Sequence, residues 1–161
     1  MTDPAFASMS DLDLGKLTEA AIGVLVAAGD DPQLADVQSM PAGVLKEQIT
    51  GAAEALGFPA ERAARLSDLA TRTDSAGDVA RTVLAELNRD QALAAEVAES
   101  NRRRQDLMVI DPLTISAAAL LILALRIRRV RVSKKNGVDV QLDPLKADIV
   151  EAVLGFFHGQ R

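Results

Sequence analysis

The chain of 161 residues contains no cysteine, no tryptophan and no tyrosine, and it has a single histidine, His158. Without cysteine the protein cannot form a disulfide, use a thiolate nucleophile or build a zinc finger from Cys and His ligands. These absences remove disulfides, thiol chemistry and zinc-finger ligation from the functions to be considered.

The sequence also lacks a catalytic or cofactor-binding pattern. His158 stands beside Gly159 with no serine or carboxylate at motif spacing, so we expect it to be solvated. No glycine is followed by Lys-Ser or Lys-Thr, which excludes a phosphate-binding loop of that type. Asp30, Asp31 and Asp36 do not follow a calcium-loop pattern and are expected to cap helices and fill a turn. We therefore expect a non-enzymatic protein with no cofactor, no metal ion and no small-molecule substrate.

Composition favours a folded protein of the cytoplasm. Hydrophobic residues make up 48% of the chain, which is enough to form a core and too many for a disordered tail. Residues 1–10 are acidic and contain no apolar stretch of the kind that a signal peptide needs.

Charge is distributed unevenly along the chain. Residues 1–100 contain 7 Lys and Arg against 17 Asp and Glu, whereas residues 101–161 contain 11 against 6. The acidic first part is therefore expected to attract the basic second part, either within one chain or between two copies.

The first hundred residues predict a bundle of short, Ala-rich helices. Ser10 can cap the first helix, Gly57 can end a later one, and residues 73–75 separate two more. Each segment has apolar residues at helical spacing, including Leu14, Leu45, Leu66, Val83 and Val97. Helices this short must gain their stability by packing against one another.

Residues 113–142 predict a buried helix followed by a β-hairpin. Thirteen residues without a charge, 113–125, precede the basic stretch 126–135. Side-chain parity favours a three-residue loop at 135–137, which pairs Val132 with Val140 and Val130 with Leu142. The apolar residues then share one face of the hairpin, and Arg129, Arg131 and Ser133 share the other.

The predicted fold is therefore α+β and predominantly α. Residues 1–100 form an N-terminal helical bundle, residues 101–106 a linker, and residues 107–161 a small unit of order β-α-β-β-α. In this unit the first strand is at 107–110, and the hairpin packs on the two helices.

The basic stretch is the candidate binding surface. Six cations fall within ten residues, and we expect them to bind an acidic partner: Arg126, Arg128, Arg129, Arg131, Lys134 and Lys135. Asp139 and Asp143 on the opposite strand offset part of this charge, and no aromatic residue is interleaved for base stacking. A protein partner is therefore favoured over a nucleic acid, which stays as a weaker alternative.

A second alternative is association with a membrane surface through residues 113–135. Basic residues follow the apolar run directly, as they do on the cytoplasmic side of a membrane span. The run of thirteen residues is shorter than the roughly twenty that a span requires, so a core helix is the favoured interpretation.

The order of apolar helix, Arg-rich strand, Asn136-Gly137 turn, second strand and final helix after Asp143-Pro144 resembles small effector-associated modules of bacterial conflict and signalling systems. The resemblance covers residues 107–157, and the N-terminal part is loosely similar to the death-like adaptor bundles of those systems. It implies an adaptor, able to bind a partner protein or a second copy, that couples a sensor to an effector. No residue matches a catalytic motif of such effectors.

Overall fold

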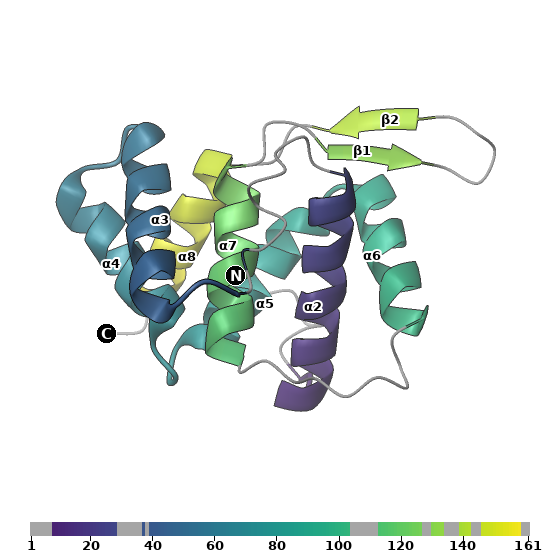
Figure 1. The fold of residues 1–161 in the computed structure, drawn as a ribbon, viewed down its shortest axis with the longest axis horizontal. Coiled ribbons are helices and arrows are strands. Elements are labelled where there is room, and N and C mark those ends of the chain that lie inside the picture. The colour runs from purple at the N-terminus through teal and green to yellow at the C-terminus, as the bar shows by residue number, and fades with distance from the viewer. Residues whose placement is uncertain are drawn as a thin grey trace.

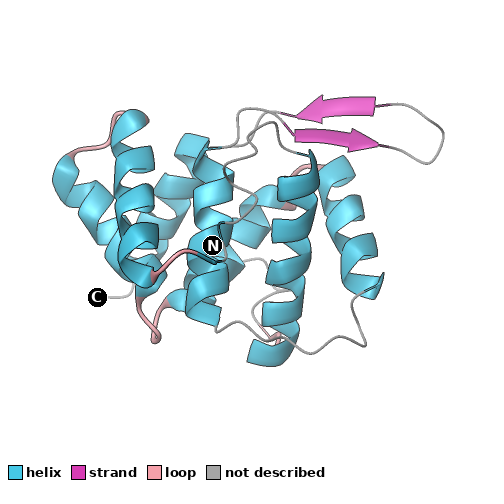
Figure 2. Cartoon of the chain, in the orientation of Figure 1, coloured by secondary structure: helices cyan, strands magenta, loops and turns pink. Residues whose placement is uncertain are grey.

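The computed structural model describes residues 8–28, 37, 39–103, 113–126, 130–133, 139–142 and 146–158. The described helices are α2 (Asp11–Ala28), α3 (Ala42–Ala55), α4 (Ala60–Thr71), α5 (Ala76–Leu87), α6 (Gln91–Arg103), α7 (Leu113–Arg126) and α8 (Lys146–His158). Two short strands, β1 (Val130–Ser133) and β2 (Asp139–Leu142), lie between α7 and α8 in the chain. The described part is therefore almost entirely helical, as the sequence predicted (Figure 2).

Helix α7 forms the centre of the molecule (Figure 1), with α2, α3, α4, α5 and α8 packed around it. All residues from Ser116 to Ala124 are fully buried, and Leu125 is 3% exposed. Each fully buried Leu or Ile contributes about 1.5–3 kcal/mol through removal of apolar surface from water. The prediction that residues 113–125 form a core helix is confirmed.

Local signals place the breaks between helices. The hydroxyl oxygen of Ser10 accepts a hydrogen bond from the backbone N–H of Asp13 at 3.2 Å, which caps α2. Gly57 has a φ of 97° and ends α3, since its N–H bonds to the Glu54 carbonyl and the next N–H bonds to the Ala53 carbonyl. These predicted caps are confirmed.

Side-chain hydrogen bonds from a serine and to an aspartate mark the breaks between α4 and α5 and between α5 and α6. The Ser75 hydroxyl donates to the Leu69 carbonyl at 2.6 Å and so pairs a carbonyl near the end of α4. Asp90 precedes α6, and its carboxylate accepts hydrogen bonds from the N–H groups of Ala92 and Leu93. Helices α5 and α6 are thus separate helices.

The backbone of β1 pairs antiparallel with that of β2, and Val130 lies opposite Leu142 and Val132 opposite Val140. This is the register that a three-residue loop requires, although residues 134–138 lie outside the described part. The predicted strand at 107–110 also lies outside it. Whether residues 107–161 form a separate α+β unit stays a prediction.

The neighbours of the hairpin differ from those predicted. The sequence placed it on the helices beside it in the chain, which are α7 and α8, whereas β1 lies mainly against α2 and α6. The reason is that α7 is already enclosed by five other helices and has no open face for a sheet. Figure 1 shows the hairpin at the end of the molecule formed by α2 and α6.

Residues from both predicted parts contribute to one continuous apolar cluster. Leu45, Leu66 and Val83 from the first part belong to the same buried cluster as Leu121 and Val153 from the second. The two parts are therefore joined mainly by buried apolar surface. Arg62 and Glu151 form an ion pair between the two parts. In this pair the cation comes from the acidic first part and the anion from the basic second part, which is the reverse of the expected attraction.

Candidate interaction site

The predicted binding residue that the structure describes most fully is Arg126, the last residue of α7. Its side chain is partly buried, and its guanidinium donates a hydrogen bond to the side-chain oxygen of Gln48 on α3. Arg126 therefore also links the C-terminal end of α7 to α3, where a cation complements the helix dipole.

The other predicted binding residues are described only in part. Arg131 has a described backbone in β1, opposite Gln141. Arg128, Arg129, Lys134 and Lys135 lie outside the described residues, as do Asp30, Asp31 and Asp36. His158 ends α8, and its side chain lies outside the described part. The structure places Arg131 in the hairpin and ties Arg126 to the helical core.

The hairpin has an edge that no described strand covers. The sheet contains two strands, so each strand pairs on one side only. Strand β1 lies against α2 and α6, and Figure 1 shows β2 as the outermost element at this end of the molecule. Backbone N–H and C=O groups on the outer edge of β2 can accept an additional strand, because such groups form hydrogen bonds wherever a partner is supplied.

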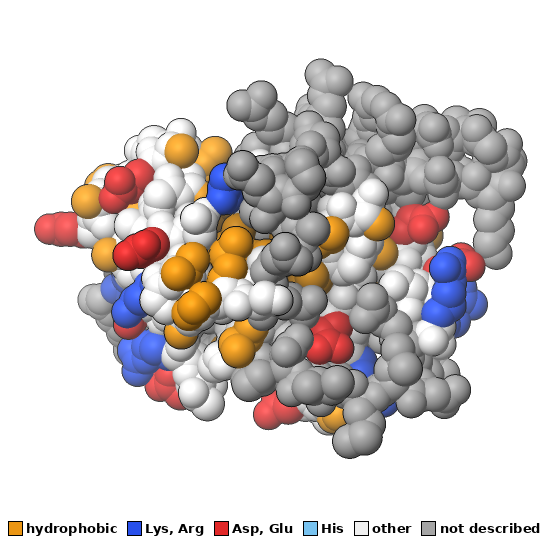
Figure 3. Space-filling model, in the orientation of Figure 1, with side chains coloured by type: hydrophobic (Ala, Val, Ile, Leu, Met, Phe, Trp, Pro, Cys, Tyr) orange, Lys and Arg blue, Asp and Glu red, His pale blue; other side chains and the backbone are white. Residues whose placement is uncertain are grey.

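Charges on the opposite end of the molecule are mixed. Figure 3 shows acidic and basic side chains interspersed over α3 and α4, so the described part of this face has no continuous basic surface. Lys46 lies 3.6 Å from Asp68, and Arg72 pairs with both Asp68 and Asp74. This arrangement does not match the continuous cationic surface that binding to a phosphate backbone requires.

Arg62 forms an ionic contact between two helices. Its guanidinium donates two hydrogen bonds to Glu151 and lies 5.2 Å from the centroid of the Phe58 ring. These hydrogen bonds lower the pKa of Glu151 below its ordinary value and raise that of Arg62. The cluster connects α4 to α8 and contains no nucleophile, so its role is structural.

A pocket that sequence reasoning did not find lies between α2, α5 and α6. Its volume is about 360 Å³, and its apolar lining residues are Leu17, Leu84, Leu87, Leu93, Ala94, Val97 and Ala98. Asn88, Asn101 and Arg102 complete the lining. From the sequence alone, these leucines are expected to be ordinary core residues. No sequence signal near residues 88–90 indicates that the helices on either side of this break diverge.

Two further features of the described residues bear on function. No helix among them is long and apolar enough to cross a bilayer. No group of three or more His, Asp or Glu side chains in the described part could hold a metal ion.

Comparison with known proteins adds no assignment to this geometry. The chain matches no protein family model, no curated protein and no solved structure. The function must therefore be argued from the chain itself.

Proposed function

We propose that this chain is a non-enzymatic interaction protein that binds a partner through its hairpin, and that a second copy of the chain is one such partner. The observation that carries the proposal is the open outer edge of β2, which no described segment covers. An exposed strand edge binds an extended segment through backbone hydrogen bonds, and nearby side chains then select among partners.

The positive charge near the hairpin indicates that the preferred partner is acidic. The stretch 126–135, which contains β1 and precedes β2 in the chain, contributes six cations, whereas the chain as a whole has a net charge of −5. An acidic segment would therefore be attracted to the hairpin, and residues 1–100 of a second copy supply such acidic segments. Electrostatic attraction of this kind raises the association rate and weakens as salt concentration rises.

The proposed setting is a bacterial signalling or defence system in the cytoplasm. It follows from the resemblance of residues 107–157 to effector-associated modules, with an adaptor role between a sensor and an effector. The predominantly helical architecture is compatible with such a role but does not distinguish it from other helical interaction proteins.

Among the described residues, no structural feature favours the membrane alternative. Its anchor would include residues 113–125, and most of these are fully buried among other helices. Insertion into a bilayer would require α7 to leave the core, with the loss of the apolar contacts that stabilise the fold.

Light scattering on the full chain tests the proposal. We expect the molar mass to rise above 17.0 kDa with protein concentration at low salt, and to return to it in high salt. The double variant Arg128→Glu, Arg131→Glu should stay monomeric under all of these conditions, because it replaces attraction to an acidic partner with repulsion.

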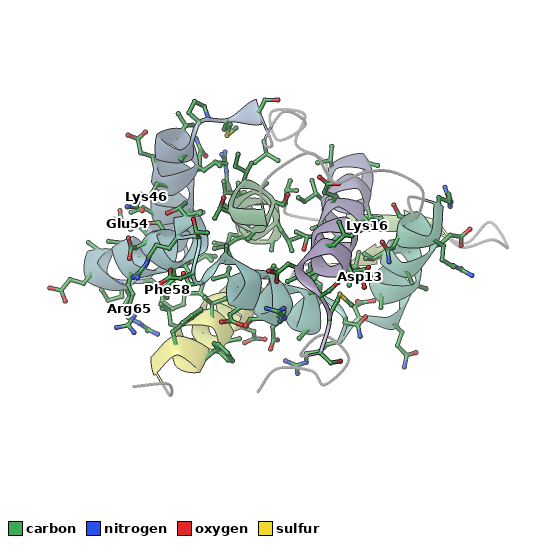
Figure 4. All side chains as sticks on the ribbon, turned by 90° about the horizontal axis from the view of Figure 1, so that it is seen from below. Asp13, Lys16, Lys46, Glu54, Phe58 and Arg65 are labelled. Carbon is green, nitrogen blue, oxygen red and sulfur yellow. The ribbon has the colours of Figure 1, made fainter. Side chains whose placement is uncertain are left out.

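A matched control carries the same change in net charge on another surface. In the variant Arg65→Glu, Arg103→Glu, one change lies on α4 at the end of the molecule shown on the left of Figure 4, and the other lies in the last turn of α6. The control should associate like the wild type. Equal loss of association in both variants would assign the effect to net charge and reject the hairpin as the binding site.

A further inference from the structure

The pocket between α2, α5 and α6 combines apolar walls with a single cation at its rim. Leu84, Leu87, Leu93 and Val97 form the deep part and are each at most 7% exposed. Asn88, Ala98 and Arg102 are the exposed members of the same lining, so they mark where the pocket opens to solvent. A volume of about 360 Å³ lies within the usual range for small-molecule sites.

Two of the three polar lining residues lie together at the end of α6, and the third, Asn88, follows α5. Asn101 and Arg102 lie in the last turn of α6, and no described residue forms an ion pair or a hydrogen bond with the Arg102 side chain. The adjacent Arg103, by contrast, pairs with Glu99 at 3.3 Å. Arg102 is thus a guanidinium with its donors available beside an apolar cavity, and it is the only charged side chain among the described lining residues.

More than half of the lining residues lie along α6. The lining includes residues from Leu93 to Arg102 on this helix, a separation of about 14 Å at 1.5 Å per residue. A narrow, elongated apolar ligand fits such a space better than a compact ring system. A guanidinium at the rim binds a carboxylate with charge-assisted hydrogen bonds, and two donors can engage both oxygens.

We propose that this pocket binds a free carboxylate with an unbranched acyl chain of medium length, with the chain between α2, α5 and α6 and the carboxylate on Arg102. The proposal does not depend on the interaction role argued above, because the pocket is separate from the outer edge of β2. It adds a small-molecule ligand that the sequence gave no reason to expect.

Calorimetric titration of the full chain with sodium decanoate, below its micelle concentration, tests the proposal. We expect saturable binding at one site. Arg102→Gln should weaken decanoate binding about tenfold or more, because a charge-assisted hydrogen bond is lost. The matched control Arg103→Gln should bind within roughly twofold of the wild type, because its guanidinium lies outside the lining.

Two further measurements distinguish decanoate binding in the pocket from nonspecific binding to the protein surface. Ala98→Phe places a ring at the exposed mouth of the pocket and should abolish binding without disturbing the core, which a thermal melt of each variant verifies. Decanol, which has the same chain without the charge, should bind more weakly than decanoate and be unaffected by Arg102→Gln. No saturable decanoate binding, or equal binding by the wild type and Ala98→Phe, would overturn the site; equal binding of decanoate and decanol would overturn the role of Arg102.

Discussion

Arg62 on α4 and Glu151 on α8 are joined by two parallel hydrogen bonds of 3.2 and 3.0 Å, although 89 residues separate them in the chain. The pair connects helices from the two parts that the sequence analysis distinguished. Both side chains are well exposed, at 42% and 58%, so solvent screens much of their attraction.

The pKa shift of Glu151 gives the pair a definite pH dependence. Because the hydrogen bonds from Arg62 lower the pKa of Glu151 in the folded state, its contribution to stability is present above the ordinary carboxyl pKa. The contribution is lost as pH falls through the lowered pKa and the carboxylate becomes protonated. Glu151→Gln should therefore slightly lower the melting temperature at pH 7, and the difference from the wild type should disappear once the pH is low enough to protonate Glu151 in the folded state. A difference that stays constant across this pH range would show that the charge of Glu151 is not involved.

Two glycines of one helix region should respond oppositely to alanine. Gly57 has a φ of 97° in the left-handed region, so Gly57→Ala should lower the free energy of unfolding by about 1–2 kcal/mol. Gly51 is an exposed position inside α3, and Gly51→Ala should raise the free energy of unfolding by about 0.5–1 kcal/mol. A Cβ at either position meets no atom within 4 Å, so both effects come from the backbone alone. Urea denaturation measures them, and a loss of stability in both variants would contradict the assignment.

The helices and their ends could be predicted because their causes are local. Ser10 and Gly57 act on backbone groups three or four residues away, and such short-range chemistry is visible in the sequence. The central position of α7 was also predictable, since an uncharged run too short for a bilayer has few alternatives to burial.

The neighbours of each element could not be predicted in the same way. Periodicity identifies which face of α2 or α6 is apolar, but not that β1 covers part of these helices. The pocket depends on how far α6 diverges from α5 after residue 90, which is a consequence of packing between three helices. For the same reason Arg126, predicted from its charge as a binding residue, is also part of the contact between α7 and α3.

Burial of α7 leads to the largest expected effect of a single substitution. Leu121 is fully buried in the central helix, whereas Leu12 in the first turn of α2 is 60% exposed. Leu121→Ala removes buried methyl groups and leaves a cavity, which should lower the free energy of unfolding by about 2–5 kcal/mol. Leu12→Ala makes the same chemical change at the surface and should alter the free energy of unfolding by less than about 0.5 kcal/mol. Since domains of this size have a total stability of about 5–15 kcal/mol, the first variant should unfold at a clearly lower urea concentration. Similar midpoints for the two variants would mean that α7 does not form the core, and they would reopen the possibility that residues 113–125 contact a membrane.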